Sequence, residues 1–151
     1  MVYYDHALPD AQPGFRSGEA GRVMIRTDGE VETDVRVRLT PNSVHALEGH
    51  GVLDALNALP LAIGPIAAGR DAVLRPSALS AASRILVEAD RTTYGARHEF
   101  AVGRSAVPEP VEFRIRIDNR EYQRTLARLQ YLVTLAGREG HAVRLRIGDT
   151  G

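Results

Sequence analysis

The sequence predicts an α+β fold, a two-layer sandwich in which helices cover one face of a mostly antiparallel sheet. Two recurring patterns support this prediction. In several short segments apolar residues alternate with charged ones, which is typical of strands buried on one face. In longer segments apolar residues recur every three or four positions, which is typical of amphipathic helices. With 151 residues, 44% of them hydrophobic, the chain is long enough for a single domain over 1–151 with its own core.

Residues 1–21 are rich in glycine, proline and small polar residues, and we expect them to form an irregular arm. Residues 22–26 and 30–39 then predict an antiparallel hairpin. Asp28-Gly29 lies between them, and glycine tolerates the positive φ of a tight hairpin turn. In the second strand we expect four apolar side chains to face inward: Val31, Val35, Val37 and Leu39.

Two helical regions follow the hairpin. Residues 43–60 predict either one helix interrupted around Gly49 or two short helices. Residues 75–91 predict a further helix with Pro76 in its first turn. The sequence leaves open the conformation of the apolar stretch 61–74 that joins them.

The second half of the chain predicts two strands, a helix and a last strand. Residues 94–102, 111–117 and 141–148 alternate in the manner of strands. Asp118 is a suitable N-cap for the intervening helix. One apolar seam runs along this helix with spacings of four and three: Tyr122, Leu126, Leu129, Val133 and Ala136.

The order of these elements over residues 30–147 is β-α-β-β-α-β, which resembles the ferredoxin-like superfold, with residues 22–26 as an extra N-terminal hairpin strand. In that superfold the first long strand already has a neighbour on each side, so residues 22–26 would have no free edge to pair with. Another α+β arrangement therefore stays open. The resemblance concerns architecture alone and implies no function.

Composition argues against several classes of function. The formal net charge is zero, so no overall field steers the chain toward nucleic acid or an anionic membrane. Without cysteine there is no disulfide and no thiolate nucleophile or metal ligand. The longest apolar stretch is too short to span a bilayer, and the N-terminus lacks a signal-peptide pattern. We expect a cytoplasmic protein that does not bind membranes.

All 19 basic residues are arginine. A GC-rich genome of bacterial type would explain this bias by codon usage alone. The bias still has a physical consequence, because the planar guanidinium pairs bidentately with carboxylates and phosphates.

Alternation predicts one outward sheet face that carries seven arginines, with Arg22 and Arg26 beside them. The seven are Arg36, Arg38, Arg97, Arg114, Arg116, Arg144 and Arg146. Acids of the same parity, such as Glu30 and Glu32, could neutralise them in cross-strand ion pairs. The face could instead contact a second copy or an acidic partner. It could also bind nucleic-acid phosphates, although no aromatic residue faces outward for base stacking.

A second arginine group lies on the predicted helix after Asp118, on the side opposite to the apolar seam. Its members are four residues apart: Arg120, Arg124 and Arg128. This spacing places all three on one helix face. We expect this stripe to be a second contact surface.

Candidate catalytic and metal-binding residues form no familiar pattern. His45 and His50 are five residues apart, about 140° around a helix, whereas a helical zinc site uses i and i+4. His98 has the parity of core residues, and we expect His141 to be exposed at a turn. No nucleophile motif or glycine-rich phosphate loop occurs. We therefore expect no metal, no cofactor and no enzymatic activity.

The leading hypothesis is a non-catalytic protein-interaction or assembly module whose arginines bind a second copy or another protein. One alternative is an RNA- or DNA-binding protein that contacts phosphates through the sheet, including a metal-independent nuclease with His98 or His45 as base and Tyr94 nearby. A further alternative is a small-molecule-binding regulatory domain with the apolar stretch 60–74 at its pocket.

Overall fold

A computed structural model gives the fold and describes residues 2–5, 17–26, 29–93, 97–104 and 112–148. Within these residues the chain forms an α+β structure, as the sequence predicts. Strands form one five-stranded and one three-stranded sheet. Four α-helices accompany them.

The five-stranded sheet is antiparallel and has the strand order β3-β2-β8-β5-β4. Its members are β3 (Gly29–Leu39), β2 (Gly18–Arg26), β8 (Ala142–Ile147), β5 (Arg70–Leu74) and β4 (Leu61–Ile63). β2 and β3 form the predicted hairpin, with Arg26 opposite Gly29. Asp28, the other predicted turn residue, lies outside the described residues.

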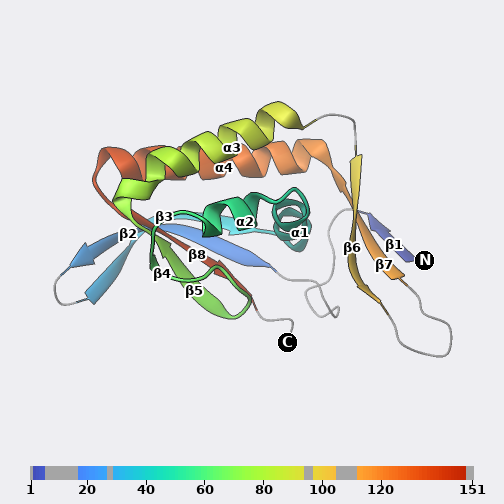
Figure 1. Ribbon diagram of the computed structural model, residues 1–151, viewed down its shortest axis with the longest axis horizontal. Coiled ribbons are helices and arrows are strands. Elements are labelled where there is room, and N and C mark those ends of the chain that lie inside the picture. Colours follow the sequence, from blue (N-terminus) through green and yellow to red (C-terminus); the bar gives the residue numbers. More distant parts are fainter. Residues whose placement is uncertain (1, 6–16, 27–28, 94–96, 105–111, 149–151) are drawn as a thin grey trace.

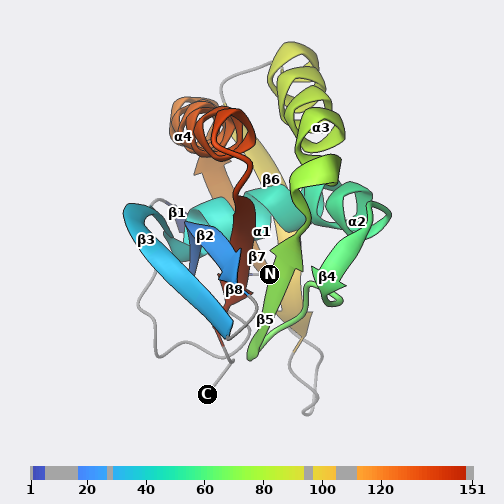
Figure 2. The ribbon, with the colours of Figure 1, turned by 90° about the vertical axis from the view of Figure 1, so that its left-hand side faces the viewer.

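All four helices lie on one side of this sheet (Figure 1, Figure 2). They are α1 (Pro41–Gly49), α2 (Val52–Asn57), α3 (Leu79–Thr92) and α4 (Asn119–Arg138). A 3₁₀ turn (Pro76–Ala78) leads into α3, and Gly51, with φ +79°, separates α1 from α2. The two short helices and the Pro76 start agree with the sequence.

The core lies between the helices and the facing side of the sheet. Its sheet residues include Val37, Leu39, Ala72, Leu74, Val143, Leu145 and Ile147. All five residues of the predicted α4 seam are buried in the same core. α4 ends at Arg138, and the φ of +70° at Gly140, just past its end, allows the His141 amide to donate back to the Ala136 carbonyl at 2.9 Å.

The three-stranded sheet has the order β1-β7-β6 and lies at one end of the molecule (Figure 1). Its strands are β1 (Val2–Asp5), β7 (Glu112–Asp118) and β6 (Arg97–Arg104). β7 pairs parallel with β1 and antiparallel with β6. The expectation that all long strands join one sheet is therefore wrong, and the ferredoxin-like arrangement is not confirmed.

The prediction that residues 1–21 are irregular is also wrong, because residues 2–5 form β1 and residues 18–21 begin β2. Glycine in a strand marks a close approach of two backbones. A Cβ at Gly18 would lie 2.7 Å from the Arg146 carbonyl oxygen on β8. The glycine that indicated an irregular arm therefore permits the pairing of β2 with β8.

The helix-facing side of the hairpin differs from the prediction at two positions. Val31, expected inward, is 46% exposed, because the joined ends of β2 and β3 project beyond the helices (Figure 1). Arg22, expected outward, pairs with core-facing Val143 and lies on the helix side. Its Nη1 reaches the Glu139 carboxylate at 2.8 Å, just past the end of α4, with 12% of the side chain exposed.

A hydroxyl network, buried at Ser43 and Thr125, joins the start of α1 to the first turns of α4. Thr40 is the N-cap of α1, and its Oγ1 accepts from the Ser43 amide at 3.2 Å and lies 3.0 Å from Glu121 Oε1. The Ser43 and Thr125 hydroxyl oxygens are 2.7 Å apart. The Thr125 hydroxyl lies 3.1 Å from the Glu121 carbonyl.

Each hydroxyl in this network has one proton to donate, and this sets the direction of the bonds. Thr125 donates to the Glu121 carbonyl and Thr40 to the Glu121 carboxylate, because neither acceptor can donate. Ser43 therefore donates to Thr125. Both hydroxyls are buried, so the loss of either one removes a buried hydrogen bond. The remaining hydroxyl keeps another neighbour, because Thr125 donates to the Glu121 carbonyl and Ser43 Oγ lies 3.1 Å from Thr40 Oγ1.

We expect Ser43→Ala and Thr125→Val each to lower the free energy of unfolding by about 0.5–1.5 kcal/mol, because each removes one buried hydrogen bond. The double variant should lose less free energy of unfolding than the two single variants together, since the two hydroxyls share one hydrogen bond. Urea unfolding of the four proteins measures the coupling. Additive effects would mean that the two hydroxyls do not interact.

Candidate functional site

The seven predicted sheet arginines do not share one face. Four of them, Arg36, Arg38, Arg144 and Arg146, lie on the outer face of the five-stranded sheet, which points away from the helices. The other three, Arg97, Arg114 and Arg116, belong to β6 and β7 of the three-stranded sheet, and their side chains lie outside the described residues. The prediction that one sheet face carries all seven arginines is therefore wrong, because the strands separate into two sheets.

The outer face of the five-stranded sheet carries a row of alternating charges. Across β3, β2, β8 and β5 the register aligns Arg38, Glu19, Arg146 and Asp71. Arg146 Nη1 lies 3.2 Å from Asp71 Oδ1. Arg36, in the next row, has its Nη1 3.8 Å from Glu19 Oε1.

These contacts favour cross-strand ion pairing for Arg36 and Arg146, two of the four arginines on this face. The two pairs are largely exposed, so each contributes about 0–1 kcal/mol to stability. Arg38 lies opposite Glu19 in the register, yet the described residues place no carboxylate within ion-pair distance of it. Arg38 is therefore the cation of this row that is available to a ligand.

A cleft of about 570 Å³ lies where this charge row meets the end of the sheet. It forms where β2 begins, β3 and β8 end and α1 starts. Arg38, Glu19 and Arg146 line it together with Ser17, Thr40 and the glycines at 18 and 148. The Gly148 amide donates to the Ser17 carbonyl at 2.8 Å and so ties the two chain segments that border the cleft. A volume of this size is typical of small-molecule sites.

The arginine stripe of α4 is where the sequence predicts it. Arg120, Arg124 and Arg128 are all exposed, on the side of α4 opposite to the buried seam. Arg124 Nε donates to the Arg120 carbonyl at 3.3 Å. The described residues place no carboxylate within ion-pair distance of Arg124 or Arg128. Tyr131, one turn further along, is 66% exposed and extends the stripe.

The histidines form no metal centre within the described part of the chain, where no three potential ligands lie close enough to hold an ion. His45 is buried, with its Nδ1 3.9 Å from the Glu48 carboxylate. His141, expected to be exposed, is mostly buried because it follows the α4 cap, and its Nδ1 lies 3.4 Å from Glu139. The side chain of His98, and Tyr94 altogether, lie outside the described residues.

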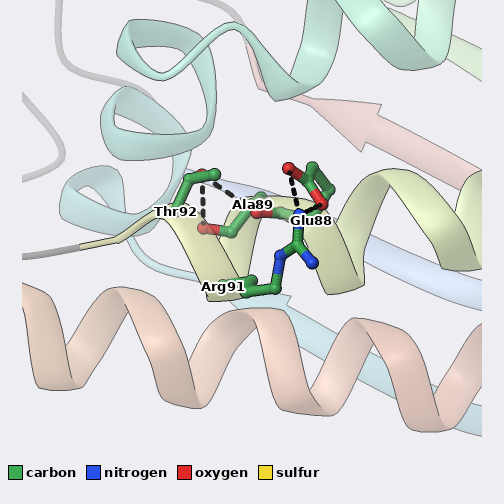
Figure 3. A network of polar contacts seen from close by, with 4 residues as sticks. All are labelled: Glu88, Ala89, Arg91 and Thr92. Carbon is green, nitrogen blue, oxygen red and sulfur yellow. Dashed lines mark hydrogen bonds and ion pairs between the residues drawn. The ribbon is translucent and has the colours of Figure 1, made fainter.

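A second hollow, a groove of about 390 Å³, lies between α2 and α3. Its walls are Val52, Ala55, Ile85 and Ala89, and its polar edge includes His50, Arg84 and Thr92. Figure 3 shows the adjoining turn of α3, where Arg91 reaches the Glu88 carboxylate at 3.0 Å and the Thr92 hydroxyl donates to the Glu88 carbonyl at 2.9 Å. These polar groups form an ion pair and a hydrogen bond with one another along one edge of the groove. The predicted pocket segment 60–74 does not line it.

Tyr122 is the buried polar side chain next to this groove. It is 1% exposed, and its ring meets that of His50 edge-on with centroids 4.5 Å apart. Its hydroxyl has no hydrogen-bond partner among the residues that the structure describes. Burial, together with the negative charge of Asp90, raises the pKa of Tyr122 from 10.0 to about 12. The sequence identified this residue as core but not as a titrating group.

We expect Tyr122→Phe to leave stability at neutral pH unchanged or slightly higher, because it removes an unsatisfied hydroxyl. The raised pKa favours the neutral phenol in the folded state. This preference contributes its full amount to the stability of the folded state below pH 10, and the contribution is lost as the pH rises through about 12.

Urea unfolding from pH 8 to pH 12 measures this effect. From pH 8 to pH 12 the free energy of unfolding of the wild type should fall by about 2–3 kcal/mol relative to that of Tyr122→Phe. Tyr131→Phe is the matched control, because that ring is exposed. Equal alkaline profiles for wild type and Tyr122→Phe would contradict the assignment.

The sequence did not predict that two carboxylates, Glu19 and Asp71, lie on the outer face. Both lie in segments that we did not predict as strands, residues 18–21 and 70–74. The alternation in Arg70-Asp71-Ala72-Val73 is short and follows an apolar stretch, so it is weak as a strand signal. The acids expected on this face, among them Glu30 and Glu32, have side chains outside the described residues.

Among the described residues no helix is both long and apolar enough to cross a membrane. No family model, no curated protein and no solved structure matches the chain. The arrangement of its own residues is therefore what a functional proposal must rest on.

Proposed function

We propose that this chain is a non-catalytic interaction module that docks an acidic segment of a partner protein on the exposed face of α4. One observation carries the proposal. Three arginines stand four residues apart on the solvent side of the longest helix, and two of them have no carboxylate partner among the described residues.

The spacing of the stripe suits an acidic helix. Residues four apart on a helix are about 6 Å apart along its axis and differ by about 40° in direction. A partner helix with carboxylates every fourth residue has the same spacing, so its charges could pair with Arg120, Arg124 and Arg128 in turn. Tyr131 adds an aromatic contact beside them. Arginine and tyrosine are the residue types that carry much of the binding energy at protein interfaces.

The stripe fits a different protein better than a second copy of this chain. A symmetric contact between two α4 helices would bring like charges together, which opposes association. Nucleic acid is also a weaker fit, because the net charge is zero and the sheet arginines Arg36 and Arg146 already have carboxylate neighbours.

The buried serine of α1 has a structural role in this arrangement and not a catalytic one. Activation of a serine needs a base within hydrogen-bond reach. Ser43, the buried serine of α1, bonds to the Thr125 hydroxyl instead. Its surroundings serve to join α1 to α4.

The proposal predicts opposite effects of Arg124→Glu on stability and on binding. Like charges four residues apart destabilise a helix, so the substitution should raise the free energy of unfolding by about 0.5–1 kcal/mol. The same change should weaken binding of an alanine-based helical peptide with glutamate at every fourth position by at least tenfold, measured by fluorescence anisotropy at physiological salt.

Arg84→Glu on the neighbouring helix α3 is the matched control, because Arg84 is also exposed and the change in net charge is the same. It should leave peptide binding within twofold of wild type. Equal losses in both variants would overturn the proposal. So would tighter binding of a single-stranded oligonucleotide than of the peptide, or a stable dimer in light scattering that Arg124→Glu dissociates.

A further inference from the structure

We propose that the cleft at the end of the five-stranded sheet binds a small organic acid that carries one carboxylate and a neighbouring hydroxyl or ammonium group. The site is separate from the α4 stripe and does not depend on it. It is built from the charge row of the outer face, where positive and negative side chains alternate on adjacent strands.

The positive part of the site is Arg38. Its guanidinium has no carboxylate within ion-pair distance among the described residues and lines the cleft. Arg146 lines the cleft two strands away, with its Nη1 held 3.2 Å from Asp71. Because Asp71 lies within ion-pair distance of Arg146, Arg38 is the cleft arginine that has no carboxylate partner among the described residues. A guanidinium pairs with a carboxylate through two parallel hydrogen bonds.

The negative part of the site is Glu19, which stands between the two arginines in the strand register. Adjacent strands are about 4.8 Å apart, so a carboxylate on Arg38 would place its neighbouring substituent near Glu19. A hydroxyl or ammonium group could donate to Glu19 there. A second negative charge on the ligand would lie close to the Glu19 carboxylate and be repelled by it, which disfavours phosphate and dicarboxylates.

The remaining polar wall fits the same ligand. The Ser17 hydroxyl lines the cleft and has no hydrogen-bond partner among the described residues, so it can donate to the carboxylate or accept from the donor group. Thr40 is already committed, because its hydroxyl accepts from the Ser43 amide and lies 3.0 Å from Glu121. Specificity would therefore rest on Arg38, Glu19 and Ser17.

Gly18 allows β2 and β8 to approach each other closely beside the cleft. A Cβ there would lie 2.7 Å from the Arg146 carbonyl oxygen and 3.4 Å from side-chain atoms of Leu39 and Ile147. A larger residue would push β2 away from β8 at the floor of the cleft. The close approach thus sets the distance between Glu19 and Arg146.

The test is an NMR titration of the full chain with three probes: lactate, acetate and inorganic phosphate. We expect lactate to shift the amides of residues 17–19, 38–40 and 146–148, with an affinity at least threefold tighter than acetate and tenfold tighter than phosphate. Arg38→Ala should weaken lactate binding at least tenfold. Glu19→Gln should bring the lactate and acetate affinities together and should improve phosphate binding.

Arg144→Ala is the matched control, because Arg144 shares the outer face of β8 with Arg146 but does not line the cleft. It should leave lactate binding within twofold of wild type. The proposal is overturned if no probe shifts the cleft amides, if phosphate binds as tightly as lactate, or if the Arg38 and Arg144 variants lose affinity equally. Because Arg38 is exposed, its loss should not unfold the protein, and Arg38→Gln gives a second check.

Discussion

Burial of one face of α4 is the constraint on which the rest of the structure depends. Its apolar seam contacts the helix-facing side of the five-stranded sheet, and α3 packs along its length. Leu126, Leu132 and Ala136 are fully buried there. Because the seam must face the core, the helical period places Arg120, Arg124 and Arg128 in solvent. The arginine face proposed for docking is thus the side of α4 opposite to its buried seam.

α4 also joins the two sheets, since it follows β7 of the three-stranded sheet and leads into β8 of the five-stranded sheet. Polar contacts hold both of its ends. At the start, the hydroxyls of Thr40, Ser43 and Thr125 connect it to α1. At the end, Glu139 accepts from Arg22 of β2. Directional bonds at the two ends fix the rotation of the helix about its axis, which dispersion between aliphatic side chains specifies less strictly.

The two candidate sites differ in their electrostatics. On the outer sheet face Arg36 and Arg146 have carboxylates close by, so the field is local and changes sign from one strand to the next. Such an arrangement selects the shape and charge pattern of a small ligand. On α4 the three cations share one face, and the neighbouring acid Glu121 lies 3.0 Å from the Thr40 hydroxyl at the start of α1. That arrangement suits a longer partner of opposite charge.

The sequence by itself determined the elements whose pattern is local. Period-two and period-3.6 patterns identified the hairpin, β8, α3 and α4, and the α4 seam predicted both its buried face and its arginine stripe. Parity also assigned Arg144 and Arg146 to the outside of β8, because Val143 and Leu145 must be buried. In each of these cases the chemistry of neighbouring residues specifies the structure.

Tertiary structure alone decided which strands pair. Alternation tells which side of a strand is buried but not which strand lies next to it, so the separation of β6 and β7 from the main sheet left no trace in the pattern. The strand at residues 18–21 depends on the close approach of Gly18 to Arg146 of β8, which is distant in sequence. The local composition of residues 18–21 indicates a loop instead. The cleft has the same origin: Arg38, Glu19 and Arg146 come from three strands, and only their register brings them together.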